Sequence, residues 1–158
     1  MYPVSSEGLN KETDKAVYFF TPAFAPLDNF SAHVVCVWGL AFPTSEHAYQ
    51  WKKYFSAHPE IAEEILAAPS PHAAKDIANK NVGKLPSSWQ EERVRVMEEA
   101  LRAKAAQHED VREALKRTGK RMIIENSPVD SFWGAGPDGK GENMLGKVWM
   151  KIRDSSYT

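Results

Sequence analysis

The sequence predicts an α+β fold, a mainly helical single domain with a few short β-strands. Residues 43–118 carry repeated helix-start signals and apolar residues three or four positions apart, which is typical of helices. Short β-branched or aromatic runs flank this stretch on both sides. A length of 158 residues suits one domain with a real core. We expect residues 1–15 to form a mobile polar arm and residues 16–158 to form the single domain.

Strands are expected mainly in the N-terminal part of that domain. The run AVYFF (16–20) is short, apolar and aromatic, which predicts a strand. Residues 21–32 contain two prolines and an Asp-Asn pair, so they predict a loop. The run HVVCVWGLAF (33–42) is β-branched around Gly39 and predicts a strand or a hairpin.

Helix-start signals then recur along the middle of the chain. Thr44 or Ser45 can N-cap a helix that reaches about residue 57. Pro59 and Pro71 suit the first turns of two further helices, expected over 59–68 and 71–79. The remaining elements are a helix over 89–107, a helix over 109–118 stopped by Gly119, a strand over 121–125, a Gly-rich loop over 126–144 and a last helix over 144–154.

Composition excludes several classes of protein. The formal net charge of −1 argues against a binder that works mainly by neutralising phosphates. The single cysteine, Cys36, excludes an internal disulfide and a cysteine-based zinc site and fits a reducing compartment. The five histidines show no ligand spacing, so we expect no metal, and we expect no cofactor. No apolar run of about 18 residues occurs, so we expect no membrane span and a cytoplasmic protein.

The stretch AFPTSEHAYQWKKY (41–54) combines ionisable groups with aromatic rings. At about 100° per residue, Glu46, Gln50 and Lys53 share one helix face, and Tyr49 lies one turn from both charged residues. A solvated polar face would explain such a pattern. A functional face would explain why large aromatic residues flank it.

The Gly-rich segment from Pro128 to Gly146 feeds the last helix. Its glycines allow a ligand to approach the backbone, and helix N-termini bind phosphates, but turn formation alone also explains them. Asp130, near Phe132 and Trp133, is either a carboxyl tuned for acid/base work or a loop cap. Trp89 is either a core residue at a helix start or a stacking platform.

Several motifs occur in one order along nearly the whole chain, from about residue 19 to residue 153. They are LDNFSAH, FPTSEHAYQWKKY, Trp89 with Met97, ALRAK, DSFWGAG and GKGENMLGKVWMKIR. In combination they resemble the NADAR family, which is linked to NAD and ADP-ribose metabolism and includes the YbiA-like proteins. The resemblance implies an N-glycosidase fold of several helices and a few short strands.

The resemblance also implies a reaction, cleavage of the bond between a ribosyl anomeric carbon and a nitrogen. Two substrate classes are associated with the family. One is the set of ribosylamine-phosphate intermediates of riboflavin synthesis, and the other is ADP-ribose attached to guanine bases, including bases within DNA or RNA. Here the residues before Trp89 are Pro86-Ser87-Ser88, whereas many YbiA-like members carry Arg or Asn close before this tryptophan. This departure favours ADP-ribosyl-guanine, the substrate of DNA ADP-ribosylation reversal.

The resemblance implies that such an enzyme needs Glu46, Trp89 and Asp130, and Lys53 matches the family's lysine. We expect Glu46, Lys53 and Asp130 to be the catalytic residues. The substrate-binding residues that the resemblance implies are Asn29, Phe30, Tyr49, Trp89, Trp133, Gly134, Asn143 and Gly146. Of these, the tryptophans would stack on the base or the ribose, and the loop would hold phosphate or ribose hydroxyls. Arg153 is either a phosphate ligand or a partner for the C-terminal dipole of its helix.

Two mechanisms fit these residues. In one, Glu46 and Asp130 act as the two carboxyls of a glycosidase, one as acid and one activating water. In the other, which we favour slightly, Lys53 captures the opened ribosyl ring as an imine. A non-catalytic ADP-ribose or nucleotide-binding module is the alternative function, and a structural partner protein is a third.

Overall fold

The structure, a computed structural model, describes residues 8–20 and 25–158. The α+β prediction is confirmed, because the described residues form six α-helices and a few short strands. Contacts divide the chain into two compact units, and each unit has a core of its own. Unit 1 comprises residues 1–31 and 109–158, and unit 2 comprises residues 32–108. Residues 1–7 of the expected arm and 21–24 of the expected loop lie outside the described residues.

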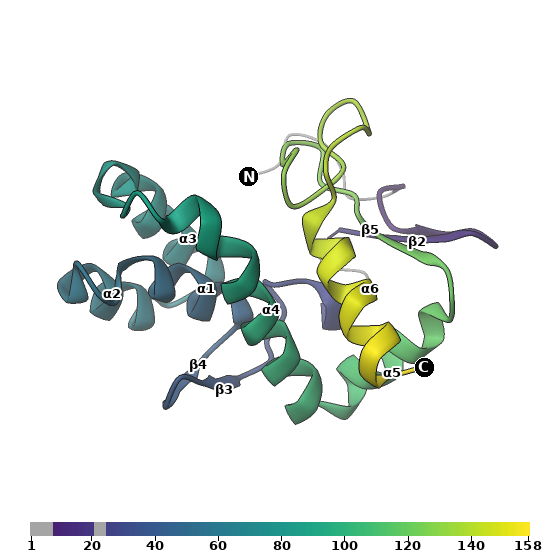
Figure 1. The fold of residues 1–158 in the computed structure, drawn as a ribbon, viewed down its shortest axis with the longest axis horizontal. Helices are drawn as coiled ribbons and strands as arrows, with labels where there is room; N and C mark the ends of the chain where they lie inside the picture. Colours follow the sequence, from purple (N-terminus) through teal and green to yellow (C-terminus); the bar gives the residue numbers. More distant parts are fainter. Residues whose placement is uncertain (1–7, 21–24) are drawn as a thin grey trace. The chain divides into compact units, whose positions relative to one another are not determined.

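Unit 2 consists of a β-hairpin followed by four α-helices, as Figure 1 shows. Its elements are β3 (Val35–Val37), β4 (Leu40–Phe42), α1 (Ser45–Tyr54), α2 (Pro59–Leu66), α3 (Pro71–Lys80), the 3₁₀ helix η2 (Val82–Lys84) and α4 (Trp89–Gln107). None of the helices within the described ranges is long and apolar enough to cross a membrane.

The predicted helix starts of unit 2 are confirmed by their caps. The Thr44 hydroxyl accepts the backbone N–H of His47 at 3.1 Å, which satisfies a donor that has no partner within α1. Ser70 caps α3 in the same way by accepting the Ala73 N–H at 3.0 Å. Pro59 and Pro71 each occupy a first-turn position, where their missing N–H costs nothing.

The core of unit 2 lies where α1 packs against α2 and α3. Apolar side chains fill it, from Phe42, Ala48, Trp51, Tyr54, Ile61, Ala62, Ile65, Ala68, Ala74, Ala78 and Ala100. The many alanines let the helices approach closely. The Tyr54 hydroxyl donates to the Ala78 carbonyl at 2.6 Å, and burial raises the pKa of this phenol. The hydroxyl therefore stays protonated and joins α1 to α3.

Residues 33–42 form the hairpin rather than one strand. Trp38 and Gly39 have φ angles of 53° and 82°, the positive values that a two-residue hairpin turn requires. A positive φ is costly for a bulky residue such as Trp38. Its ring contacts offset that cost, because it stacks on Trp51 at 6.2 Å and its indole N–H donates to Glu99 at 2.9 Å.

Unit 1 combines a three-stranded sheet with two helices. Its elements are β1 (Lys11–Glu12), β2 (Ala16–Phe19), the 3₁₀ helix η1 (Ala25–Leu27), α5 (Glu109–Thr118), β5 (Met122–Glu125) and α6 (Met144–Ser156). The strand order is β1-β2-β5, with β1 antiparallel to β2 and β2 parallel to β5. Part of the expected N-terminal arm is therefore the edge strand of this sheet.

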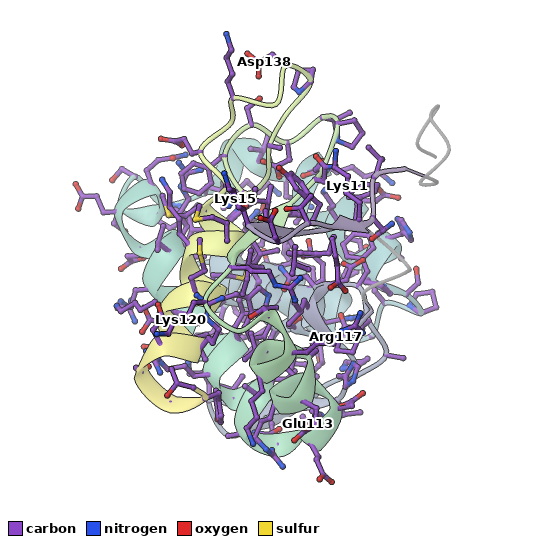
Figure 2. The ribbon with its side chains drawn as sticks, turned by 90° about the vertical axis from the view of Figure 1, so that its right-hand side faces the viewer. Lys11, Lys15, Glu113, Arg117, Lys120 and Asp138 are labelled. Atoms are coloured by element: carbon purple, nitrogen blue, oxygen red, sulfur yellow. The ribbon has the colours of Figure 1, made fainter. Side chains whose placement is uncertain are left out.

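Helix α6 forms the centre of unit 1. It packs against β5 and contacts α5, as the yellow helix in Figure 1 shows. Trp149 on α6 is completely buried, and its indole N–H donates to the Leu27 carbonyl at 2.9 Å. The Gly-rich loop between β5 and α6 has Asp138 at its outer end (Figure 2). Its two ends join β5 and the first turn of α6.

Candidate functional site

The first turn of α1 is held in place by His47 in addition to its Thr44 cap. The His47 Nε2 lies 3.0 Å from the Ala68 carbonyl, which can only accept, so Nε2 carries a proton. The Nδ1 atom lies 2.8 Å from the Thr44 hydroxyl. These bonds join the start of α1 to the segment after α2. The neighbouring residue, Glu46, thus projects from a fixed helix start.

Glu46 and Gln50 form a buried polar pair on α1. The two side chains are 6% and 3% exposed, and Gln50 Nε2 donates to Glu46 Oε1 at 2.7 Å. Gln50 Oε1 has no hydrogen-bond partner, and no described residue donates to Glu46 Oε2. Buried acceptors without donors are rare in proteins and call for an explanation. A ligand that brings a hydroxyl or N–H group would satisfy the Gln50 oxygen.

Lys53 lies beside two aromatic rings. Its ammonium nitrogen is 5.0 Å from the centre of the Tyr49 ring and 5.9 Å from the centre of the Trp89 ring. The two rings themselves are 5.5 Å apart and tilted by 56°. Ring faces attract cations, so this position favours the charged lysine. A neutral, nucleophilic Lys53 therefore needs a base or a substrate that displaces these contacts.

These residues make up what we call the α1 cluster: Glu46, Tyr49, Gln50, Lys53 and Trp89. The expected common face of α1 is confirmed, since Glu46 and Gln50 are bonded and Lys53 contacts Tyr49. Trp89 is a buried residue at the start of α4, which confirms its predicted core role, and its role as a stacking platform stays a prediction. Gln50 was absent from the predicted binding residues, although its i,i+4 spacing from Glu46 was a usable signal.

The α1 cluster offers three kinds of chemistry at one place. A carboxylate can exchange a proton, a primary amine can bind a carbonyl carbon or stabilise an anion, and the two buried aromatic rings form an apolar wall. The amide of Gln50 fixes the carboxylate of Glu46 in one orientation. This combination suits a substrate with both a sugar and a flat base.

In unit 1, Asp130 caps the turn that leads into the Gly-rich loop. Its Oδ1 accepts the backbone N–H groups of Phe132 and Trp133 at 2.9 and 2.8 Å. The predicted capping role is therefore confirmed. No described residue donates to Oδ2, so the second oxygen of this half-buried carboxylate is available for a further interaction.

Structural contacts account for three predicted binding residues of unit 1. Both polar atoms of the Asn143 side chain bond to β5, since Oδ1 accepts the Glu125 N–H and Nδ2 donates to the Ile123 carbonyl, each at 2.9 Å. A Cβ on Gly146 would lie 2.0 Å from that same carbonyl, and one on Gly134 would lie 2.8 Å from the Glu125 carbonyl. Close packing thus explains these residue types without a ligand, and their predicted role in binding substrate stays a prediction.

Three N–H groups at the start of α6 already have backbone partners, and their predicted role in holding phosphate stays a prediction. The Asn143 N–H donates to the Gly134 carbonyl at 3.1 Å, and the Met144 N–H donates to the Phe132 carbonyl at 2.9 Å. The Leu145 N–H donates to the Trp133 carbonyl at 3.0 Å. The loop folds back onto the helix and satisfies these donors itself. An anion would have to displace the loop before it could reach them.

The other predicted residues of unit 1 also have defined surroundings. Asn29 is buried in the turn after η1, and the Phe30 N–H donates to Asp28 Oδ1 at 2.9 Å. The Trp133 ring packs edge-to-face on Phe132 at 4.8 Å. Their role in binding substrate stays a prediction.

Comparison with known proteins finds a matching family model and several similar proteins. A family model described as the NADAR domain matches residues 10–155. An N-glycosidase of Nostoc punctiforme is 35% identical over 141 residues, which are 87% of this chain and 90% of that protein. A riboflavin biosynthesis protein of Vibrio vulnificus is 32% identical, and the match covers 89% of this chain and 38% of that protein.

The Escherichia coli protein YbiA is similar in sequence and in structure. Named an N-glycosidase, it is 33% identical over 143 residues, 89% of this chain and 88% of that protein. Its NMR structure matches with a TM-score of 0.80 and 32% identity, over 93% of this chain and 88% of the other.

Proposed function

Because the chain belongs to the NADAR family, we propose that it is an N-glycosidase that hydrolyses the bond between a ribosyl C1 atom and a nitrogen. The buried Glu46–Gln50 pair carries this proposal. The unpartnered Gln50 oxygen suits a ribose hydroxyl, and a carboxylate held in one orientation suits proton transfer in glycosidic bond cleavage. Relatives named N-glycosidases support the same reaction.

The proposed substrate is ADP-ribose attached to a guanine base, with ribosylamine-phosphate intermediates of riboflavin synthesis as the second substrate class. The first follows from the family resemblance of the sequence motifs and from the Pro86-Ser87-Ser88 run before Trp89. The second is supported by the riboflavin biosynthesis protein among the relatives. In both, a flat base would lie against the rings of the α1 cluster.

In the proposed mechanism Lys53 Nζ forms a bond to the ribosyl C1 atom once the sugar ring has opened. Glu46 transfers the protons of this step. The departing base leaves with an N–H, and the former ring oxygen stays on the opened sugar as a hydroxyl. Water then hydrolyses the imine, which returns the amine of Lys53 and releases the sugar. The two-carboxyl route through Glu46 and Asp130 is the alternative.

Borohydride trapping decides between these routes. During turnover of ADP-ribosyl-guanosine we expect the reagent to reduce the imine and to leave one ADP-ribosyl adduct on Lys53, found by peptide mass spectrometry. Lys52→Ala serves as the control, because Lys52 is the adjacent amine and lies over Trp38 and Phe55 instead. Hydrolysis without any adduct would favour the two-carboxyl route.

Asp130 is tested by two substitutions with different structural consequences. Asp130→Asn keeps an Oδ1 that can accept the Phe132 and Trp133 N–H groups, whereas Asp130→Ala removes that cap. We expect both to lose activity if the carboxyl takes part in the reaction, but only Asp130→Ala to lower stability, by about 1 kcal/mol. Full activity of a stable Asp130→Asn enzyme would restrict Asp130 to capping.

Substrate incubation tests the function itself. We expect release of ADP-ribose from DNA that carries ADP-ribosylated guanine, followed by chromatography. A second reaction contains the ribosylaminopyrimidine phosphate. No turnover of either compound by the folded protein would contradict the glycosidase proposal. A rise in melting temperature with ADP-ribose but no turnover would favour a binding module.

A further inference from the structure

A basic run, KRTGKR (116–121), ends α5 and leads into β5. Its two arginines are engaged by an acidic partner, since Arg117 and Arg121 both pair with Glu12. Among the described residues, only one of its two lysines has an acidic partner, and that pair is exposed. Lys116 is an exposed residue 3.7 Å from Glu113, and Lys120 has no ion-pair partner among the described residues.

Both lysines line one open hollow in unit 1. It has a volume of about 480 Å³ and lies between the C-terminal ends of α5 and α6. Its lining residues are Lys116, Gly119, Lys120, Arg153, Asp154, Tyr157 and Thr158. Figure 2 shows Lys120 beside the C-terminal half of α6. The volume is within the range of small-molecule sites.

Arg153 adds a buried positive charge to this hollow. The residue is only 3% exposed, and Nε donates to Asp154 Oδ1 at 2.8 Å. Its Nη1 donates to the Thr118 hydroxyl at 3.0 Å and to the Arg121 carbonyl at 2.6 Å. No described residue accepts a hydrogen bond from Nη2. The guanidinium is thus fixed in place with one donor nitrogen to spare.

The negative end of α5 does not cancel these charges. The last carbonyls of a helix normally repel an anion. Here the Lys116 carbonyl accepts the Gly119 N–H, and the Arg117 and Thr118 carbonyls accept the Arg121 side chain. Asp154 is the one acidic side chain that lines the hollow, and it pairs with Arg153. Three cationic side chains therefore line the hollow, and its one acidic side chain is paired.

We propose that this hollow binds a small phosphate-bearing molecule. Lys116 and Lys120 would contact the phosphate from the surface, and Arg153 would donate to it from below. Tyr157, which is half-buried, would form the wall beside the rest of the molecule. Within unit 1 this site is separate from the Gly-rich loop, because Arg153 on α6 lies ten residues after Asn143, the N-cap of α6, which is about 15 Å along a helix.

Titration of the whole protein with inorganic phosphate tests the proposal by NMR. We expect the backbone amides of Gly119, Lys120 and Tyr157 to shift and to saturate with one dissociation constant. The double variant Lys116→Ala/Lys120→Ala should bind at least about tenfold more weakly, because two charge-assisted contacts are lost. The control Lys80→Ala/Lys84→Ala removes the same charge from exposed positions of unit 2 and should leave the constant within about twofold.

Further ligands identify the source of the phosphate. Ribose 5-phosphate that binds more tightly than inorganic phosphate supports a small phosphorylated metabolite, with ribose alone as the neutral control. A single-stranded oligonucleotide that binds more tightly than both supports a nucleic-acid backbone as the source and overturns the small-molecule assignment. Phosphate shifts absent from these three amides, or equal loss of binding in the control variant, overturns the site. The readout is binding, so it is independent of the proposed hydrolysis.

Discussion

Replacement of Glu46 by glutamine is expected to lower kcat for hydrolysis of ADP-ribosyl-guanosine by about 100- to 10,000-fold, the usual worth of a general acid or base. The substitution removes the exchangeable proton of the carboxyl but retains its shape. The new amide can still accept the Gln50 N–H through Oε1, so the pair that orients it survives. We therefore expect normal folding and a selective loss of the chemical step.

The matched control for this variant is Glu91→Gln. Glu91 is an exposed glutamate in the first turn of α4, within the same unit, and the substitution changes the net charge equally. Its activity should stay within about twofold of the unmodified protein, and both variants should melt at the same temperature. Single-turnover rates with excess enzyme separate chemistry from binding. A Glu46→Gln enzyme that retains its single-turnover rate would remove Glu46 from the mechanism.

Local signals in the sequence predicted the helices well because caps and prolines act within one turn. Thr44, Pro59 and the Ser70-Pro71 pair each mark a start that the structure confirms. The expected end of α1 near residue 57 was too late, since the helix ends at Tyr54. His58 precedes a proline, and such a residue disfavours helical geometry, so α1 must end before α2 begins.

Pairings between distant segments could not be predicted in the same way. Strand β2 pairs with β5, and more than one hundred residues separate Val17 from its partner Ile123. The contact between Tyr49 and Trp89 likewise depends on how α1 packs against α4. The Glu46–Gln50 pair needed only helical spacing, so that part of the site was readable from periodicity. Local spacing fixes which residues share a face but not which faces meet.

The glycines of the loop show why one residue type supports two readings. A glycine is expected both where a ligand approaches the backbone and where another segment of chain does so. At Gly134 and Gly146 that other segment is β5 of the same unit. The sequence shows that a small residue occupies each position, but it does not show which neighbouring atoms require one.

Gly146→Ala is therefore expected to be a stability variant before it is an activity variant. Its new Cβ would lie 2.0 Å from the Ile123 carbonyl and 2.5 Å from both polar atoms of the Asn143 side chain. The carbonyl belongs to β5 and already accepts from Asn143, so it cannot move without breaking that bond. We expect a loss of at least about 3 kcal/mol, the upper end for overpacked cores. A fall in melting temperature of roughly 6–12 °C would correspond to this loss.

Gly83→Ala is the control that separates crowding from the general effect of alanine. Gly83 has no positive φ, and a Cβ there would meet nothing within 4 Å. Alanine at such a site reduces the freedom of the unfolded chain, so stability should rise by about 0.4–1 kcal/mol. Urea unfolding of both variants measures the two opposite shifts. If Gly146→Ala keeps full stability and loses only substrate affinity, close packing on β5 is not what requires this glycine, and the ligand-binding reading of Gly146 is the correct one.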